Sequence, residues 1–252
     1  MASTKRTTFL SKLSPNSHKY SRGMVGVVAG SESFPGAAVL CVGGARLGGA
    51  GYIHYMATDR TPTGLVLSAY PDVVPVSTYD DRVDAWVIGP GNPAQYRLPA
   101  SRYLVLDAAA MADAVKSEAE FTVILPHEGE AAHLGFPVTE GIDREAIASL
   151  MAKTMKVFVI LKGRKTIIAS PSGELLVDEI GGPELSCAGS GDILAGVTAS
   201  MLSSWKPTTH TEVHKVLLKA VQAHSTAGKL AAKKVRPVTS PDILKALQRI
   251  HH

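Results

Sequence analysis

Residues 121–130 read FTVILPHEGE. The stretch begins as a continuous apolar, β-branched run and passes directly into Pro126, His127 and two acids. A short, continuous apolar run predicts a strand that is buried on both faces, as in a parallel sheet. In an open parallel sheet, ligands bind beyond the carboxyl ends of the strands. The stretch therefore predicts one strand of the fold and one part of a binding site.

Four more runs of this kind begin at Met24, Ala85, Tyr103 and Val157, and each ends at Gly, Asp or Lys. Segments with helical periodicity lie among them, at residues 36–49, 130–135, 143–154, 191–202 and 212–234. Strands that alternate with helices indicate a layered α/β fold. Residues 165–182 instead predict two strands that turn at residues 171–173, which is a hairpin at the edge of the sheet. We expect the five strand ends to meet at one edge.

Composition limits the function classes. The chain has 252 residues, 45% hydrophobic and 19% charged, and a net charge of +4; its 26 basic residues are scattered through the chain and accompanied by 22 acids. This balance suits an anionic small molecule and does not require nucleic acid. Two distant cysteines argue against a disulfide framework or a thiolate metal site, and no apolar run is long enough to span a membrane. We expect one cytoplasmic domain over residues 1–252, with residues 1–17 as a flexible N-terminal segment.

Residues 184–202, ELSCAGSGDILAGVTASML, place small residues directly before Asp192 and an apolar helical run. Glycines let backbone N–H groups approach a ligand, and the first N–H groups of a helix lack intrahelical partners. The pattern predicts an anion site, with phosphate as the commonest anion. Asp192 then either takes a proton or holds a cation beside the phosphate. The alternative is that Asp192 simply caps the helix and the glycines form a turn.

The chain resembles the NAD(P)H-hydrate dehydratases of the ribokinase-like superfamily. The similarity rests on HKYSRGMVGVVAGSESFPGAAVL, GAGY, GPG, LDA, PHEGEAAHLG, VILKGRKTIIASPSGEL and AGSGDILAG in this order, from about residue 18 to about residue 232. It implies a three-layer α/β/α fold with a central, mostly parallel sheet and an edge hairpin. It also implies Mg²⁺, ADP or ATP as co-substrate, NADH or NADPH hydrate as substrate, and a homo-oligomer, with a tetramer as one candidate.

The resemblance also implies roles for individual residues. Asp192 is expected to accept the proton of the substrate hydroxyl and to contact the substrate. The other expected substrate contacts are Ala37, Ala38, Gly89, Gly91 and His127. The expected nucleotide contacts are Lys162, Gly163, Arg164, Lys165, Thr166, Gly189, Ser190 and Gly191. Helix packing, plain turns, a structural histidine and an exposed basic hairpin are the alternatives. We expect His224, in an apolar helical pattern, to be a packing residue.

Some positions depart from the family pattern. Ala109 stands where the family usually has a second acid, and Cys187 and Ala188 stand where it has Thr and Gly. Gly182 replaces a usual Asn, and Pro93 replaces a usual Gly. These departures leave nucleotide preference and rate open. Two alternatives therefore remain, namely a vitamin or sugar kinase of the same superfamily and a catalytically weakened nucleotide-binding protein.

Overall fold

The computed structural model describes residues 9–56, 59–91, 97–138, 141 and 143–250. Within this part of the chain, nine strands form one sheet. Its order is β3 (Val74–Pro75), β2 (Tyr52–Tyr55), β1 (Met24–Val28), β4 (Ala85–Ile88), β5 (Tyr103–Leu106), β6 (Phe121–Ile124), β7 (Phe158–Leu161), β8 (Thr166–Ala169) and β9 (Leu175–Asp178). All neighbouring pairs are parallel except β7–β8 and β8–β9.

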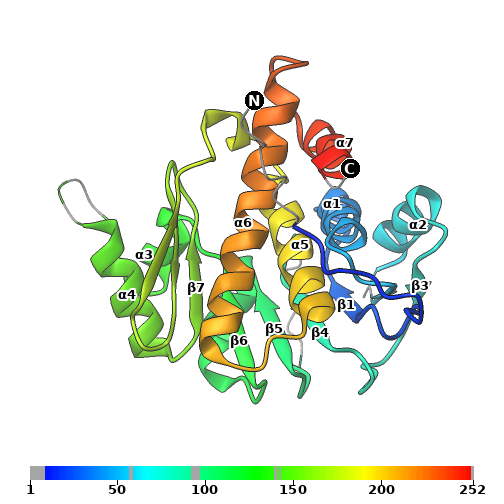
Figure 1. The fold of residues 1–252 in the computed structure, drawn as a ribbon, viewed down its shortest axis with the longest axis horizontal. Coiled ribbons are helices and arrows are strands. Elements are labelled where there is room, and N and C mark those ends of the chain that lie inside the picture. Colours follow the sequence, from blue (N-terminus) through cyan, green and yellow to red (C-terminus); the bar gives the residue numbers. More distant parts are fainter. Residues whose placement is uncertain (1–8, 57–58, 92–96, 139–140, 142, 251–252) are drawn as a thin grey trace.

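Helices cover both faces of the sheet. They are α1 (Pro35–Leu47), α2 (Arg60–Ala69), α3 (Glu128–His133), α4 (Arg144–Met155), α5 (Ser190–Trp205), α6 (His210–Ala232) and α7 (Ser240–Ile250), with 3₁₀ helices η1 (Ala108–Lys116) and η2 (Pro183–Leu185). In Figure 1, α5 and α6 cross in front of the strands, with α1, α2 and α7 on one side and α3 and α4 on the other. The predicted α/β layering with an edge hairpin is confirmed.

Two apolar layers sandwich the strands. Val25, Val27, Val87 and Val105 point to the layer shared with α1, α5 and α6. Alternate residues of the same strands, such as Ile88 and Leu106, point to the layer shared with η1 and α4. Burial of both faces explains why these strands are continuously apolar. Because β1, β4, β5, β6 and β7 run parallel, their carboxyl ends lie at one edge of the sheet, as the sequence predicts.

Helices α1 and α5 pack with their backbones in direct contact. A Cβ added at Gly196 would lie 2.0 Å from the carbonyl oxygen of Cys41, and one at Gly44 would lie 2.3 Å from that of Ile193. Such close approach excludes any side chain at either position. The two glycines therefore fix the position of α5 over the sheet.

Several elements were not predicted. Helix α2 contains Pro62 and Gly64, which are poor helix formers, and only Pro62 and Val66 are buried. Packing against α1 stabilises α2 in spite of its low intrinsic helix propensity.

Within the expected flexible segment 1–17, Phe9 is buried and its carbonyl oxygen accepts a hydrogen bond from Trp205 Nε1, while residues 1–8 lie outside the described part. No helix in the described residues is long and apolar enough to cross a membrane.

Replacing Gly196 with Ala tests the helix contact. The added methyl forces the backbones of α1 and α5 apart, so we expect a loss of roughly 1–3 kcal/mol in unfolding free energy. Thermal and urea unfolding measure the change. Gly64→Ala is the matched control, because a Cβ there meets nothing within 4 Å and alanine favours the helix. Equal stability of the two variants would contradict the close packing.

Candidate functional site

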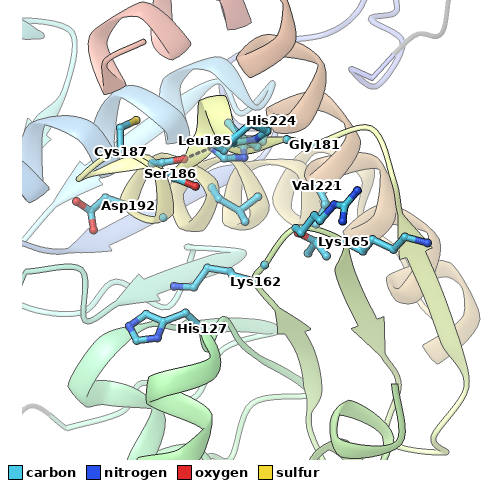
Figure 2. A pocket seen from close by; sticks show the side chains of 18 of the residues that line it. His127, Lys162, Lys165, Gly181, Leu185, Ser186, Cys187, Asp192, Val221 and His224 are labelled. Atoms are coloured by element: carbon cyan, nitrogen blue, oxygen red, sulfur yellow. Dashed lines mark hydrogen bonds between the residues drawn. The ribbon is translucent and has the colours of Figure 1, made fainter. Parts of the chain in front are cut away.

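A cavity of about 1170 Å³ opens at the carboxyl edge of the sheet (Figure 2). Its floor comes from the ends of β5, β6 and β7, and its roof from the segment before α5, from the first turn of α5 and from α6. Its lining includes Asp107, Ala108, His127, Glu130, Lys162, Gly163, Arg164, Lys165, Thr166, Gly181, Gly182, Leu185, Cys187, Ser190, Gly191, Asp192, Leu194, Val221, His224 and Lys229. Residues of six elements thus meet around one space.

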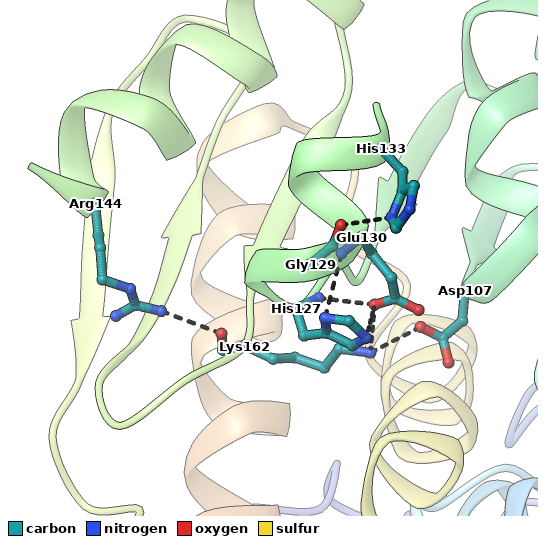
Figure 3. A network of polar contacts seen from close by, with 7 residues as sticks. All are labelled: Asp107, His127, Gly129, Glu130, His133, Arg144 and Lys162. Atoms are coloured by element: carbon teal, nitrogen blue, oxygen red, sulfur yellow. Dashed lines mark hydrogen bonds and ion pairs between the residues drawn. The ribbon is translucent and has the colours of Figure 1, made fainter. Parts of the chain in front are cut away.

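Lys162 lies at the centre of an ionic cluster on the cavity floor (Figure 3). Its Nζ is 2.9 Å from Asp107 Oδ1 and 3.5 Å from Glu130 Oε2. Burial lowers the pKa of Lys162, but these two carboxylates outweigh that effect and raise the pKa above its ordinary value. Lys162 is therefore a fixed positive charge at neutral pH, directed into the cavity from the end of β7.

The short helix α3 holds Glu130 in place. His127 is its N-cap, and the Nδ1 of His127 accepts a hydrogen bond of 3.2 Å from the backbone N–H of Glu130. The carboxylate of Glu130 in turn accepts from the backbone N–H of His127, at 2.8 Å. This reciprocal capping box orients both side chains at the end of β6. It explains why the predicted site residue His127 and the unpredicted Glu130 occur together.

Arg144 on α4 supports the turn between β7 and β8. Its guanidinium donates to the carbonyl oxygens of Lys165, at 2.7 Å, and Lys162, at 3.1 Å. The planar guanidinium of Arg144 therefore holds the backbone of the predicted nucleotide segment 162–166 in place (Figure 3).

The first turn of α5 presents unpaired donors to the cavity. Gly189 is the N-cap, in the left-handed conformation with φ of 86°, and no side chain caps the helix. In the described part of the chain, the backbone N–H groups of Gly191 and Asp192 have no acceptor. A Cβ at Gly191 would lie 3.3 Å from Lys162 Nζ. The helix end and the ammonium together form a cradle for an anion.

Asp192 lies in this turn without capping the helix, which removes the alternative of a simple N-cap. Burial and the carboxylates of Asp107 and Glu130 raise its pKa to about 6, although Lys162 opposes the shift. A carboxyl group with a pKa near neutrality can both hold and release a proton under physiological conditions. Asp192 is thus the group on this wall best suited to proton transfer.

His224 is buried, in keeping with its expected packing role, but it also lies at the cavity wall. This residue on α6 lines the cavity, and its Nε2 is 3.1 Å from Ser190 Oγ. Glu130 and His224 were not recognised because their partners in the cavity, Lys162 and Ser190, lie far away in the sequence. A signal for His224 exists in the sequence, since Val221, His224 and Gly228 share one face of a helix; for Glu130 it is the spacing of a capping box.

The predicted residues fall into two groups. His127, Lys162, Gly163, Arg164, Lys165, Thr166, Ser190, Gly191 and Asp192 line the cavity together, and Gly189 lies directly behind it as the N-cap of α5. Ala37, Ala38, Gly89 and Gly91 do not line it. They lie where the start of α1 meets the loops after β1 and β4.

This second group is tightly packed. A Cβ at Gly91 would lie 2.4 Å from the Cβ of Ala37, and the Ser31 hydroxyl donates to the carbonyl oxygen of Gly91. Ala37 and Gly91 keep partly exposed surface. Ala38 is fully buried against Gly30 and has no exposed atom for its expected substrate contact, so in this structure it is a packing residue. Pro93 lies outside the described residues.

The departures from the family pattern have structural counterparts. Cys187 lines the cavity, and its Sγ is 3.6 Å from Ser240 Oγ on α7. The same Ser240 hydroxyl donates to the carbonyl oxygen of Ala188, which ties the segment before α5 to α7. Ala109 is exposed beside Ala108, a non-glycine residue with φ of 49°. Left-handed strain of this kind is commonly found at functional sites.

Asp192→Asn tests the electrostatic account of the cavity. Because the folded-state pKa of Asp192 is raised to about 6, its stabilising contribution is full below pH 4 and is lost as the pH rises through 6. At pH 8 the ionised carboxylate costs roughly 2–3 kcal/mol at most. We expect the variant to unfold at a higher temperature than the parent at pH 8, with the difference vanishing near pH 4.

The exposed Asp113, paired with Lys116 on η1, supplies the control variant Asp113→Asn. Melting curves of all three proteins between pH 4 and pH 8 measure the effect. A Tm difference between Asp192→Asn and the parent that does not change with pH would contradict the raised pKa.

Comparison with known proteins agrees with this geometry. The NAD(P)H-hydrate dehydratase family model matches residues 25–249. The bifunctional NAD(P)H-hydrate repair enzyme of Mycobacterium tuberculosis is 35% identical over 77% of this chain, which spans only 44% of that protein's length. The ADP-dependent (S)-NAD(P)H-hydrate dehydratase of Bacillus subtilis is 30% identical, over 85% of this chain and 83% of the relative.

A solved structure extends the likeness to three dimensions. The crystal structure of the ADP/ATP-dependent NAD(P)H-hydrate dehydratase from Bacillus subtilis, co-crystallised with ATP and Mg²⁺, superposes with a TM-score of 0.86 at 26% identity. The match covers 96% of this chain and 93% of that one. Sequence, cavity and fold therefore lead to one conclusion: the chain belongs to the NAD(P)H-hydrate dehydratase family.

Proposed function

We propose that the chain dehydrates the hydrated form of NADH or NADPH, with ADP or ATP as phosphoryl donor, and so repairs damaged nicotinamide nucleotides. One observation supports this most directly. The carboxyl group of Asp192, with a pKa near neutrality, lies in the same helical turn as two unpaired N–H groups and opposite the charged Lys162. This arrangement suits phosphoryl transfer, in which positioning and charge stabilisation supply most of the catalysis.

The nucleotide is proposed to extend along the cavity from α5 towards α6. Its terminal phosphate occupies the cradle formed by Gly191, Asp192 and Lys162. The base lies between the apolar side chains of Leu185, Leu194 and Val221, which line the cavity. The hydrate approaches from the side of Gly91 and Ala37, with His127 at the junction between the two ligands.

The chemistry proceeds in two steps. Asp192 takes the proton of the ring hydroxyl, whose oxygen attacks the terminal phosphorus; the bond to the leaving phosphate oxygen breaks and AMP (or ADP) is released. The ring C–O bond then breaks, assisted by the lone pair of the ring nitrogen, and inorganic phosphate departs with the bonding electrons. Loss of a proton from the adjacent carbon restores the double bond. Lys162 and the N–H groups of α5 stabilise the charge on the transferring group.

Magnesium is part of this proposal. In the described residues no three His, Cys, Asp or Glu side chains are grouped to hold a metal ion. Mg²⁺ is usually held by one or two carboxylates together with water and substrate phosphates. Asp107 and Glu130, which line the cavity, fit that mode and are the residues that would hold it. When bound, the ion neutralises phosphate charge.

Two alternatives compete with this proposal. A small-molecule kinase would use the same base and cradle but would release a phosphorylated product. A catalytically weakened protein would bind nucleotide without turnover, in keeping with Ala109 and Cys187. Neither has an observation of its own that favours it over repair.

Cellular setting and assembly complete the proposal. The two cysteines are free thiols in this structure, which fits a reducing cytoplasm. The homo-oligomer, with a tetramer as candidate state, stays a prediction.

The decisive assay supplies hydrated NADH or NADPH, Mg²⁺ and either ADP or ATP, and follows the absorbance of the reduced nicotinamide. We expect recovery of that absorbance, with one inorganic phosphate formed for each molecule restored. Nucleotide binding without restored nicotinamide would contradict repair. A phosphorylated product on addition of a vitamin or sugar alcohol would then indicate the kinase, and no turnover of either substrate would indicate the weakened protein.

Loss of the proposed base should lower turnover by roughly 10²–10⁴-fold in Asp192→Asn, while ADP binding persists. Because the carboxylate must be ionised to accept a proton, the parent's kcat/KM should fall below pH 6. Steady-state rates from pH 5 to pH 8 measure both effects. Turnover of the variant within a few-fold of the parent would remove Asp192 from this role.

Ala37→Leu tests the proposed hydrate side. The larger side chain grows into the space beside Gly91, so we expect affinity for NADPH to fall roughly tenfold or more while ADP affinity stays near normal. Gly36→Ala is the control, since a Cβ there meets nothing within 4 Å. Separate titrations of the two ligands decide. Equal loss of both would mark Ala37 as a packing residue, and unchanged binding of both would place the substrate elsewhere.

A further inference from the structure

His224 and Ser190 join α6 to the first residue of α5. His224 is 4% exposed and Ser190 is 5% exposed, yet both line the cavity. The Nε2 of His224 lies 3.1 Å from Ser190 Oγ. Burial lowers the pKa of His224 to about 4; a hydrogen bond to the backbone of Ser190 opposes this shift, and the charge of Lys162 adds to it. The ring is therefore neutral at pH 7.

A neutral ring and a hydroxyl can share hydrogens in only two ways. Imidazole then has one donor and one acceptor nitrogen, and serine has a single hydrogen to donate. If Ser190 donates to Nε2, its hydroxyl offers only lone pairs to the cavity, and these repel a phosphate oxygen. If Nε2–H donates to Ser190 Oγ instead, the serine hydrogen stays free to donate to a ligand.

The surroundings favour the second arrangement once an anion binds. Among the described residues, the hydrogen-bond contacts of the His224 ring are to Ser190, at its hydroxyl and at its backbone, so no second residue imposes the opposite tautomer. Ser190 immediately precedes Gly191 and Asp192, whose N–H groups are unpaired, and Gly191 lies beside Lys162 Nζ. The Ser190 hydroxyl, on the α6 side of that cradle, is a side-chain group that can supply one more donor to an anion.

We propose that His224 is a positioning residue whose Nε2–H donates to Ser190 Oγ and so turns the serine hydroxyl towards a phosphate oxygen of the bound nucleotide. The proposal rests on the proposed function, because that function places nucleotide phosphate at the start of α5. It assigns to α6 a role in phosphate binding in addition to its packing on the sheet.

The same helices supply matched controls. His214, also on α6, is 5% exposed, and its Nε2 is 2.8 Å from the carbonyl oxygen of Ile168, away from the cavity lining. Ser200, further along α5, is fully buried and accepts from the backbone N–H of Ala50. Substitutions at these two positions measure what the loss of a buried histidine or serine does by itself.

The test is a double-mutant cycle read by ADP affinity. We expect His224→Leu and Ser190→Ala each to weaken binding by roughly 10- to 100-fold, the effect of one hydrogen bond to a charged group. The protein carrying both changes should bind ADP as Ser190→Ala does, because the histidine acts through the serine. His224→Gln should restore most of the affinity, since its amide N–H can replace Nε2–H. His214→Leu and Ser200→Ala should leave ADP affinity unchanged.

Two results would contradict this role of His224. Unchanged affinity in His224→Leu, or losses that add in the double variant, would overturn the inference while the parent still binds ADP. Failure of the parent to bind ADP or ATP would overturn the proposed function and this inference with it. Imidazole ¹⁵N shifts of the ADP-bound parent, assigned with His224→Gln, give an independent reading that needs no destabilised variant. They should show the Nε2–H tautomer, and the Nδ1–H tautomer would refute the proposal.

Discussion

The backbone of α5 lies directly against the backbone of α1, because Gly44 and Gly196 leave no side chain between the two helices. Because α5 packs closely on α1, its N-terminal turn lies beside the strand ends that carry Asp107 and Lys162. A larger separation would move the free N–H groups of that turn away from the ammonium of Lys162, which lies beside Gly191. The anion cradle is therefore a product of helix packing as much as of the glycines within it.

The positions of Asp107 and Glu130 determine the charge states of Lys162 and Asp192 in the cavity. Two carboxylates hold Lys162 charged in a partly buried position, while the same carboxylates and burial push the pKa of Asp192 up to about 6. Groups whose environments separate their pKa values in this manner are typical of sites that move protons. A bound nucleotide adds phosphate charge to a site that already contains three acids, which explains why the proposed reaction calls for a divalent cation as well as Lys162.

The sequence predicted well what depends on local pattern. Strands buried on both faces, such as residues 85–88, are recognisable because every residue is apolar, and the glycine-rich start of α5 has its own signature. Helix α2 was missed because its stability comes from packing against α1. The cavity contacts of Glu130 and His224 were missed because they join distant residues: Ser190 and His224 are 34 residues apart, and Glu130 and Lys162 are 32 apart (162 − 130).

The central claim is that the hydroxyl oxygen of the hydrate becomes an oxygen of the phosphate released. Hydrated NADPH formed in ¹⁸O-enriched water carries the label in that hydroxyl. After turnover with ADP and Mg²⁺ in ordinary water, mass spectrometry of the inorganic phosphate should find one ¹⁸O atom in each molecule. Restored NADPH accompanied by unlabelled phosphate would mean that the hydroxyl leaves as water, and it would contradict phosphoryl transfer at Asp192.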